Sequence, residues 1–180
     1  MDLNQFMKEV HENAVAHGWW DKPRTVATIR SLLHCELSEA MEAHRKDEPL
    51  HYIQNNGKPD GVAVELLDCC IRIMDFFAKE NLPFLTGDPN EMMLNTVYAY
   101  ETDEDSGIVN ILECDVPTFV DEMHTFIALY SLEKDVIFLE EVFGLCFAWI
   151  KHRGLDPVKL MIEKHEYNKT RSYMHGGKVC

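Results

Sequence analysis

The chain has 180 residues, 46% of them hydrophobic, which suits one globular domain with a substantial core. Lys and Arg total 17 against 31 for Asp and Glu, so the net charge of −14 argues against nucleic-acid polymers as partners, because these bind basic surfaces. No apolar run is long enough for a transmembrane helix and residues 1–10 lack the pattern of a signal peptide, so we expect a cytoplasmic protein with no membrane partner.

The hydrophobic spacing predicts an all-α fold, because no stretch alternates in the manner of a strand between turn signals. Helices are expected over residues 2–17, 24–46, 60–81, 89–100, 116–131, 134–152 and 156–173. Gly154 followed by Asp156-Pro157 indicates the end of one helix and the start of the next. The pattern is that of a helical bundle.

Two adjacent tryptophans, Trp19 and Trp20, follow Gly18 at the end of the first predicted helix. Trp20 is the better candidate for stacking on a nucleobase, and His17 and Asn13 could contact a base edge from the same end. Core packing at a helix corner is the alternative for both tryptophans.

Two carboxylate pairs, Glu36-x-x-Glu39 and Glu65-x-x-Asp68, lie in the second and third predicted helices. Residues three apart share a helix face, and both pairs lie roughly 8–9 Å from the turn that joins the two helices. We therefore expect the four groups to meet. Like charges in one place repel unless a cation lies between them, and carboxylate oxygens suit Mg²⁺ or Mn²⁺. A solvated helix face is the alternative for each pair alone.

The last predicted helix carries Lys164, Asn168 and Arg171 at spacings of four and three residues, so they share one face if the helix continues through Arg171. This face could bind phosphate through its two cations, with Asn168 bonding phosphate or sugar. A basic, solvated helix end is the alternative.

The six cysteines form no C-x-x-C pair, so neither a zinc knuckle nor a disulfide framework is indicated. We expect a reduced protein in which Cys35, Cys69, Cys70 and Cys146 are small core residues.

With E-x-x-E, a spacer and E-x-x-D, the chain resembles the MazG-like and dimeric-dUTPase-like all-α NTP pyrophosphohydrolases. EVHENAVAHGWW (Glu9–Trp20) resembles the opening helix of small MazG-like proteins, and EKHEYNKTRSYMHGGK (Glu163–Lys178) their closing segment. The resemblance covers about residues 1–83 and 139–180.

The resemblance implies an Mg²⁺-dependent hydrolase that converts a nucleoside triphosphate to a monophosphate and pyrophosphate, and a homodimer. The implied metal ligands are Glu36, Glu39, Glu65 and Asp68. It also favours phosphate binding by Lys164 and Arg171. Glu39 is our candidate for the group that orients or deprotonates the attacking water.

Residues 84–138 depart from the family pattern, since a small MazG-like chain would pass almost directly to the closing helices. Residues 66–82 can be aligned with 139–155, and Leu33-His34 with Met123-His124. One hypothesis is therefore an internally duplicated bundle within a single domain of residues 1–180. An unrelated helical insertion is the alternative.

In that alignment the metal ligands of the first copy are mostly lost: Glu36 and Glu39 correspond to Phe126 and Leu129, and Asp68 to Glu141. The second copy would be a scaffold. Two other functional classes stay open, a non-catalytic regulatory relative and a di-iron carboxylate bundle, although the latter typically uses E-x-x-H motifs.

Overall fold

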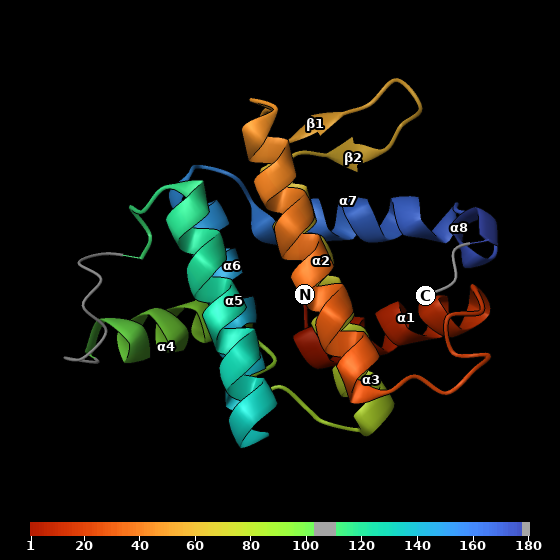
Figure 1. Cartoon of the computed structure of the whole chain (residues 1–180), viewed down its shortest axis with the longest axis horizontal. Coiled ribbons are helices and arrows are strands. Elements are labelled where there is room, and N and C mark those ends of the chain that lie inside the picture. The colour runs from red at the N-terminus through yellow and green to blue at the C-terminus, as the bar shows by residue number, and fades with distance from the viewer. Residues whose placement is uncertain (103–110, 178–180) are drawn as a thin grey trace.

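The structure, a computed structural model, describes residues 1–102 and 111–177. The fold is all-α, as predicted (Figure 1). Its helices are α1 (Leu3–Ala16), α2 (Val26–Arg45), α3 (Val62–Glu80), α4 (Pro89–Thr102), α5 (Val116–Glu133), α6 (Ile137–His152), α7 (Pro157–Lys169) and α8 (Met174–Gly177). Residues 103–110, within the expected insertion, lie outside the described part. So do residues 178–180, which include Cys180.

Four of the helices begin at polar side chains that satisfy free backbone amides. Asp2, Thr25, Asp115 and Asp156 each accept a hydrogen bond of 2.9–3.1 Å from the N–H three residues further on. The predicted break before α7 is confirmed. Gly154 has a φ of +80° just after α6, where a residue without Cβ is favoured.

Helices α2 and α3 run antiparallel, as the spacing of the carboxylate pairs requires (Figure 1). The polar stretch between them forms a small antiparallel pair, β1 (Tyr52–Ile53) and β2 (Pro59–Asp60), with Tyr52 opposite Asp60. No strand was predicted here, because two residues are too few to show alternation. The hairpin closes the end of the helix pair at which the carboxylates lie.

Helix α3 is the central element of the fold. It packs against α1, α2, α6 and α7, and most of its side chains are buried. Apolar residues lie nearly all round this helix, and a helix of that kind is generally buried. Glu65 and Asp68, the first two of its acidic residues, are consequently fixed where the four neighbouring helices surround it.

A second antiparallel pair, α5 and α6, packs on the first pair, α5 against α2 and α6 against α3. His34 of α2 and His124 of α5 meet in this contact, with their ring centroids 5.0 Å apart and their Nδ1 atoms 2.7 Å apart. Helix α4 covers α6, and a Cβ on Gly144 would overlap the Thr96 side chain there.

Helix α7 is shorter than predicted, since it ends at Lys169 and not near residue 173. The chain turns back there. The N–H of Met174 donates to the carbonyl of His17 at 3.0 Å, and the Tyr173 ring lies against Gly18. This contact between residues distant in the sequence ends the helix and places residues 171–175 beside the end of α1.

Candidate functional site

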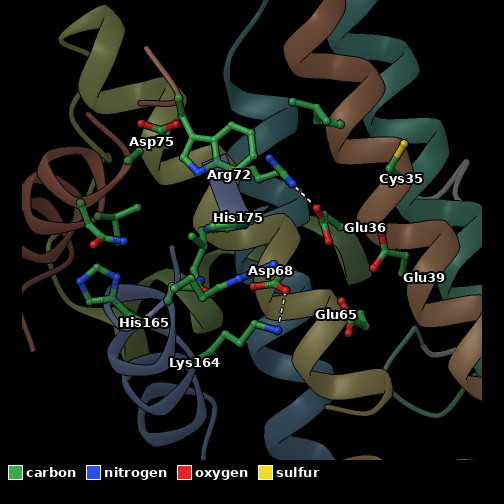
Figure 2. Close-up of a pocket in the computed structure, with 18 of the residues that line it drawn as sticks. Cys35, Glu36, Glu39, Glu65, Asp68, Arg72, Asp75, Lys164, His165 and His175 are labelled. Atoms are coloured by element: carbon green, nitrogen blue, oxygen red, sulfur yellow. Dashed lines mark hydrogen bonds and ion pairs between the residues drawn. The ribbon is translucent and has the colours of Figure 1, made fainter. Parts of the chain in front are cut away.

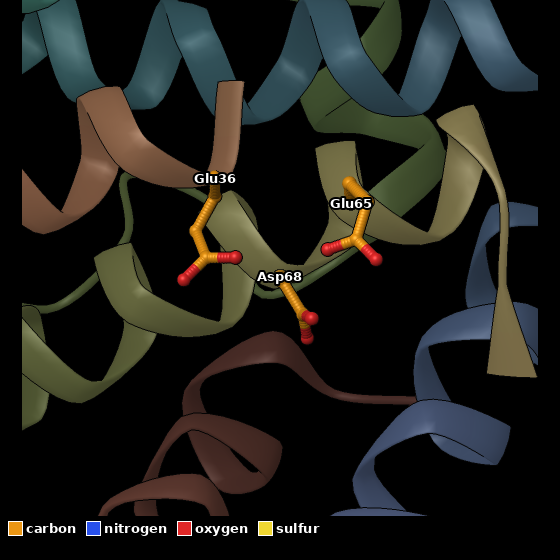
Figure 3. Close-up of side chains that lie close together, drawn as sticks. All are labelled: Glu36, Glu65 and Asp68. Atoms are coloured by element: carbon orange, nitrogen blue, oxygen red, sulfur yellow. The ribbon is translucent and has the colours of Figure 1, made fainter. Parts of the chain in front are cut away.

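Three of the four carboxylates in the two motifs come together where α2 faces α3. One oxygen each of Glu36, Glu65 and Asp68 lies within 4.8 Å of the others (Figure 3). Glu36 and Glu65 are buried, and Asp68 is partly buried. We call these three residues the acidic cluster.

Glu39, the fourth motif residue, lies outside the acidic cluster with an exposed side chain, although it lines the same cavity. The reason is helix geometry. Three residues turn a helix by about 300°, so Glu39 is rotated about 60° from Glu36. One of the pair faces α3 and the other lies at the rim.

Each member of the acidic cluster has its own cationic partner. Lys164 Nζ lies 2.7 Å from Asp68, the Arg72 guanidinium donates to Glu36, and Lys58 Nζ lies 3.7 Å from Glu65. Figure 2 shows the first two pairs. The negative charge of the cluster is thus balanced within the chain.

Burial changes the ionisation of the cluster. It raises the pKa of Glu65 to about 8, and the nearby Asp68 carboxylate adds to this effect. Burial also raises the pKa of Glu36, against the attraction of Arg72. In the absence of a bound cation, the cluster therefore retains a proton at neutral pH.

The acidic cluster lies in the wall of a cavity of about 280 Å³ (Figure 2). Helices α1, α2, α3 and α7 and the end of the chain all contribute to it. The residues of its wall that carry the following argument are Asn13, Trp19, Arg24, Lys58, His165, Asn168, Arg171 and His175.

The three residues predicted on the last helix all line this cavity. Lys164 is only 1% exposed and reaches Asp68. The Oδ1 atom of Asn168 is buried with no hydrogen-bond partner. Arg171 faces the cavity although it follows the end of α7, because the turn after Lys169 continues along the same wall.

Trp20 was the better candidate for contact with a base, but it is Trp19 that lines the main cavity. Trp20 lines a small adjoining pocket and donates from Nε1 to Asp75 at 2.9 Å. Asn13 lines the main cavity too. His17 does not, since its two ring nitrogens face the carbonyls of Asn13 and Arg171 at 2.8 and 2.9 Å.

Several residues of the wall were not predicted from the sequence. Arg72 had a signal that could have identified it, since it lies four and seven residues after Asp68 and Glu65 on one helix face. Lys58 and His165 had none, because only the fold brings them to the cavity. His165 is 1% exposed and its Nε2 has no hydrogen-bond partner.

One expectation about the cysteines is wrong. Cys35 is exposed and lines the cavity beside Glu36, whereas Cys69, Cys70 and Cys146 are buried as predicted. The helix turns Cys35 away from the core that Glu36 and Leu37 enter. Burial raises the pKa of Cys69 and Cys70 well above the ordinary thiol value.

The donor set of the acidic cluster fits a hard divalent cation. Its three ligand atoms are all carboxylate oxygens, which suit Mg²⁺ or Mn²⁺ better than softer metals. Binding such an ion would displace the proton on Glu65 and release Lys58, Lys164 and Arg72 from their present partners. These cations would then be free to face an anionic ligand.

None of the helices in the described part of the chain has the length and apolar character needed to cross a bilayer. Comparisons with known protein families, with curated proteins and with solved structures gave no match. The functional interpretation therefore depends on the residues of the cavity.

Proposed function

We propose that the protein is an Mg²⁺-dependent nucleoside triphosphate pyrophosphohydrolase, with Mn²⁺ as a possible substitute. The observation that carries this proposal is the acidic cluster in the wall of a cavity that also has five cationic side chains, those of Arg24, Lys58, Arg72, Lys164 and Arg171, besides the carboxylates of Glu39 and Asp75. Carboxylates that hold a metal beside cations that hold phosphates are the combination that phosphoryl transfer needs. The all-α bundle is compatible with the family that the sequence resembles.

The residues of the cavity would have different roles in the reaction. Glu36, Glu65 and Asp68 would hold the metal, which when bound neutralises phosphate oxygens and lowers the pKa of a water. Glu39, exposed at the rim, is free to accept a proton from the attacking water. Lys164 and Arg171 would bind phosphate oxygens and so hold the α-phosphorus in place.

Two buried polar atoms support a polar ligand in this cavity. Asn168 Oδ1 and His165 Nε2 have no partner within the described chain, and buried groups of this kind normally have one. Burial lowers the pKa of His165, so its imidazole is neutral and can donate or accept. The sugar or base of a nucleotide offers both types of group. Trp19 adds an aromatic surface.

The helix pairs α2/α3 and α5/α6 are proposed to be two copies of one ancestral unit. Support comes from His34 and His124, which occupy equivalent positions in the sequence alignment and contact one another in the structure. Residues near a two-fold axis contact their own equivalents in this way. The homodimer implied by the resemblance remains part of the proposal.

The di-iron alternative has less support, because none of the three clustered groups is a histidine. The regulatory alternative would leave the unpartnered atoms of the cavity unexplained.

The test is a panel of canonical and modified NTPs and dNTPs incubated with the protein and Mg²⁺, with products followed by ³¹P NMR. We expect a monophosphate and pyrophosphate from at least one nucleotide, and none of either when EDTA replaces Mg²⁺. Formation of a diphosphate and phosphate would reject this reaction, and the absence of any hydrolysis would favour the regulatory alternative.

A further inference from the structure

The cavity extends along helix α3. Glu65, Asp68, Arg72 and Asp75 all line it, so this wall follows one face of α3. At 1.5 Å per residue, the wall extends about 15 Å from Glu65 to Asp75. The acidic cluster lies near the first end of this wall, and the two ends differ in chemistry.

The Asp75 end is suited to a nucleoside. Asp75 holds the indole of Trp20, and the adjacent Trp19 presents its ring to the cavity. The turn after α7 approaches the same end, since the carbonyl oxygen of Arg171 lies 2.9 Å from His17 Nε2 near the end of α1. The unpartnered Asn168 Oδ1 lies one helical turn from Lys164 in that direction. Aromatic and hydrogen-bonding groups thus gather on this side of the cluster.

The Glu65 end carries charged side chains. Lys58 lies there, with Nζ 3.3 Å from Asp60 and 3.7 Å from Glu65, and its side chain is 28% exposed. The Lys58 ammonium is therefore available at the end of the cavity opposite the aromatic residues.

We propose that Lys58 binds the two terminal phosphates of the substrate and stays in contact with the leaving pyrophosphate. This assignment rests on the proposed function and gives the substrate an orientation: nucleoside beside Trp19, α-phosphate at the acidic cluster, β- and γ-phosphates toward the β1–β2 hairpin. When water attacks the α-phosphorus, the bond to the bridging oxygen breaks and its electrons pass to pyrophosphate. Lys58 neutralises the charge that develops there.

The β1–β2 hairpin holds Lys58 in position for this role. Lys58 immediately precedes β2 (Pro59–Asp60), and pairing of Ile53 with Pro59 fixes the backbone beside it. The chain therefore positions the Lys58 side chain over the first turn of α3. If Glu65 held a divalent cation, Lys58 would lose this partner and could turn to phosphate oxygens.

The experiment is a calorimetric titration of Mg²⁺-pyrophosphate, and separately of a nucleoside monophosphate, into wild type, Lys58→Gln and Lys58→Arg. We expect Lys58→Gln to weaken pyrophosphate binding about tenfold, as loss of one charge-assisted contact does, and to change monophosphate binding less than twofold. Lys58→Arg should restore most of the affinity. Lys46→Gln is the matched control, because this exposed lysine before the hairpin pairs with Glu42 and lies outside the cavity.

The results separate the two proposals. Equal pyrophosphate affinity in wild type and Lys58→Gln, or an equal loss for both ligands, would overturn the role of Lys58 even if the wild type hydrolyses triphosphates. Lys58-dependent pyrophosphate binding without any hydrolysis would uphold the polyphosphate site and reject the enzyme. A wild type that binds no pyrophosphate would reject the site.

Discussion

Arg72 and Glu36 illustrate, at the scale of single residues, how the cavity balances its charge. Glu36 has only 7% of its side chain exposed, so its carboxylate depends on the guanidinium of Arg72, which is one-third exposed. Removing one member of such a pair leaves the other without a counter-charge. The pair is therefore a structural element as well as part of the cavity.

We expect Arg72→Met to lower the free energy of unfolding by about 1–3 kcal/mol, less than for a fully buried pair because solvent screens Arg72 in part. Urea denaturation measures this. Arg45→Met is the control, since Arg45 pairs with Glu42 on an exposed helix face and should cost under about 0.5 kcal/mol. Equal effects of the two variants would contradict the buried pair.

Glu65 gives the site a pH dependence. Its pKa of about 8, raised mainly by burial, means that a cation must displace a proton at neutral pH. We therefore expect Mg²⁺ affinity to rise as pH increases from 6 to 8, by up to about tenfold per unit, and to level off above that. Calorimetry in buffers of different ionisation enthalpy would show one proton released at pH 7. Affinity that is constant over this range would contradict the assignment.

The sequence was informative about individual residues where helix spacing decides the outcome. Glu36, Glu65 and Asp68 could be grouped because three-residue spacing and one turn fix their positions. Lys58 and His165 could not, since the hairpin and the packing of α7 on α3 bring them in. Glu39 shows the limit of spacing, because the rotation of α2 decides which carboxylate is buried.

At the scale of elements, helix starts were predictable from polar caps and the end of α7 was not. Asp156 and Pro157 identify the start of α7 from local chemistry alone. Its end depends on Tyr173 and Met174 contacting Gly18 and His17, more than 150 residues away in the chain. No local pattern contains that information.

Gly18 tests this long-range contact. It has a φ of +79°, and a Cβ there would overlap the Tyr173 ring. We expect Gly18→Ala to destabilise the fold by more than about 1 kcal/mol and to expose residues 171–177 to proteolysis. Gly57→Ala is the matched control, because its φ of +84° gives the same backbone strain with no atom within 4 Å. Equal loss of stability and equal proteolysis in both variants would show that the contact with Tyr173 is unimportant.

The whole molecule has two packed helix pairs, of which only the first carries the acidic cluster. The sequence predicted the all-α class because hydrophobic spacing is a property of every helix. The contact between His34 and His124 could not be deduced in the same way, although the alignment had placed them at equivalent positions. In that alignment Glu141 corresponds to Asp68. It lies in the second pair, where burial and the neighbouring Glu140 raise its pKa.

Glu141 gives the stability of the whole fold a dependence on pH. Burial, with the neighbouring Glu140, raises its pKa to about 7 from an ordinary value of 4.5. Between these values the unfolded chain loses the proton first, so stability falls as pH rises and levels off above about 7. Glu141→Gln should therefore be about 1 kcal/mol more stable than wild type at pH 8 and equal to it at pH 4, a value discounted for partial exposure.

Urea denaturation at pH 4, 5.5 and 8 checks this, with Glu133→Gln as an exposed control at the end of α5. Parallel pH curves for Glu141→Gln and wild type would contradict the buried carboxyl.

The most direct test of the acidic cluster as a metal site is Mn²⁺ binding followed by electron paramagnetic resonance in wild type, Glu65→Gln and Glu42→Gln. Glu42 lies on the same helix as Glu36 but pairs with Arg45 and Lys46 outside the cavity. We expect one Mn²⁺ site in wild type, unchanged in Glu42→Gln and weakened about tenfold or more in Glu65→Gln. A folded wild type that binds no Mn²⁺, or binds it as well after Glu65→Gln, would contradict the acidic cluster as a metal site.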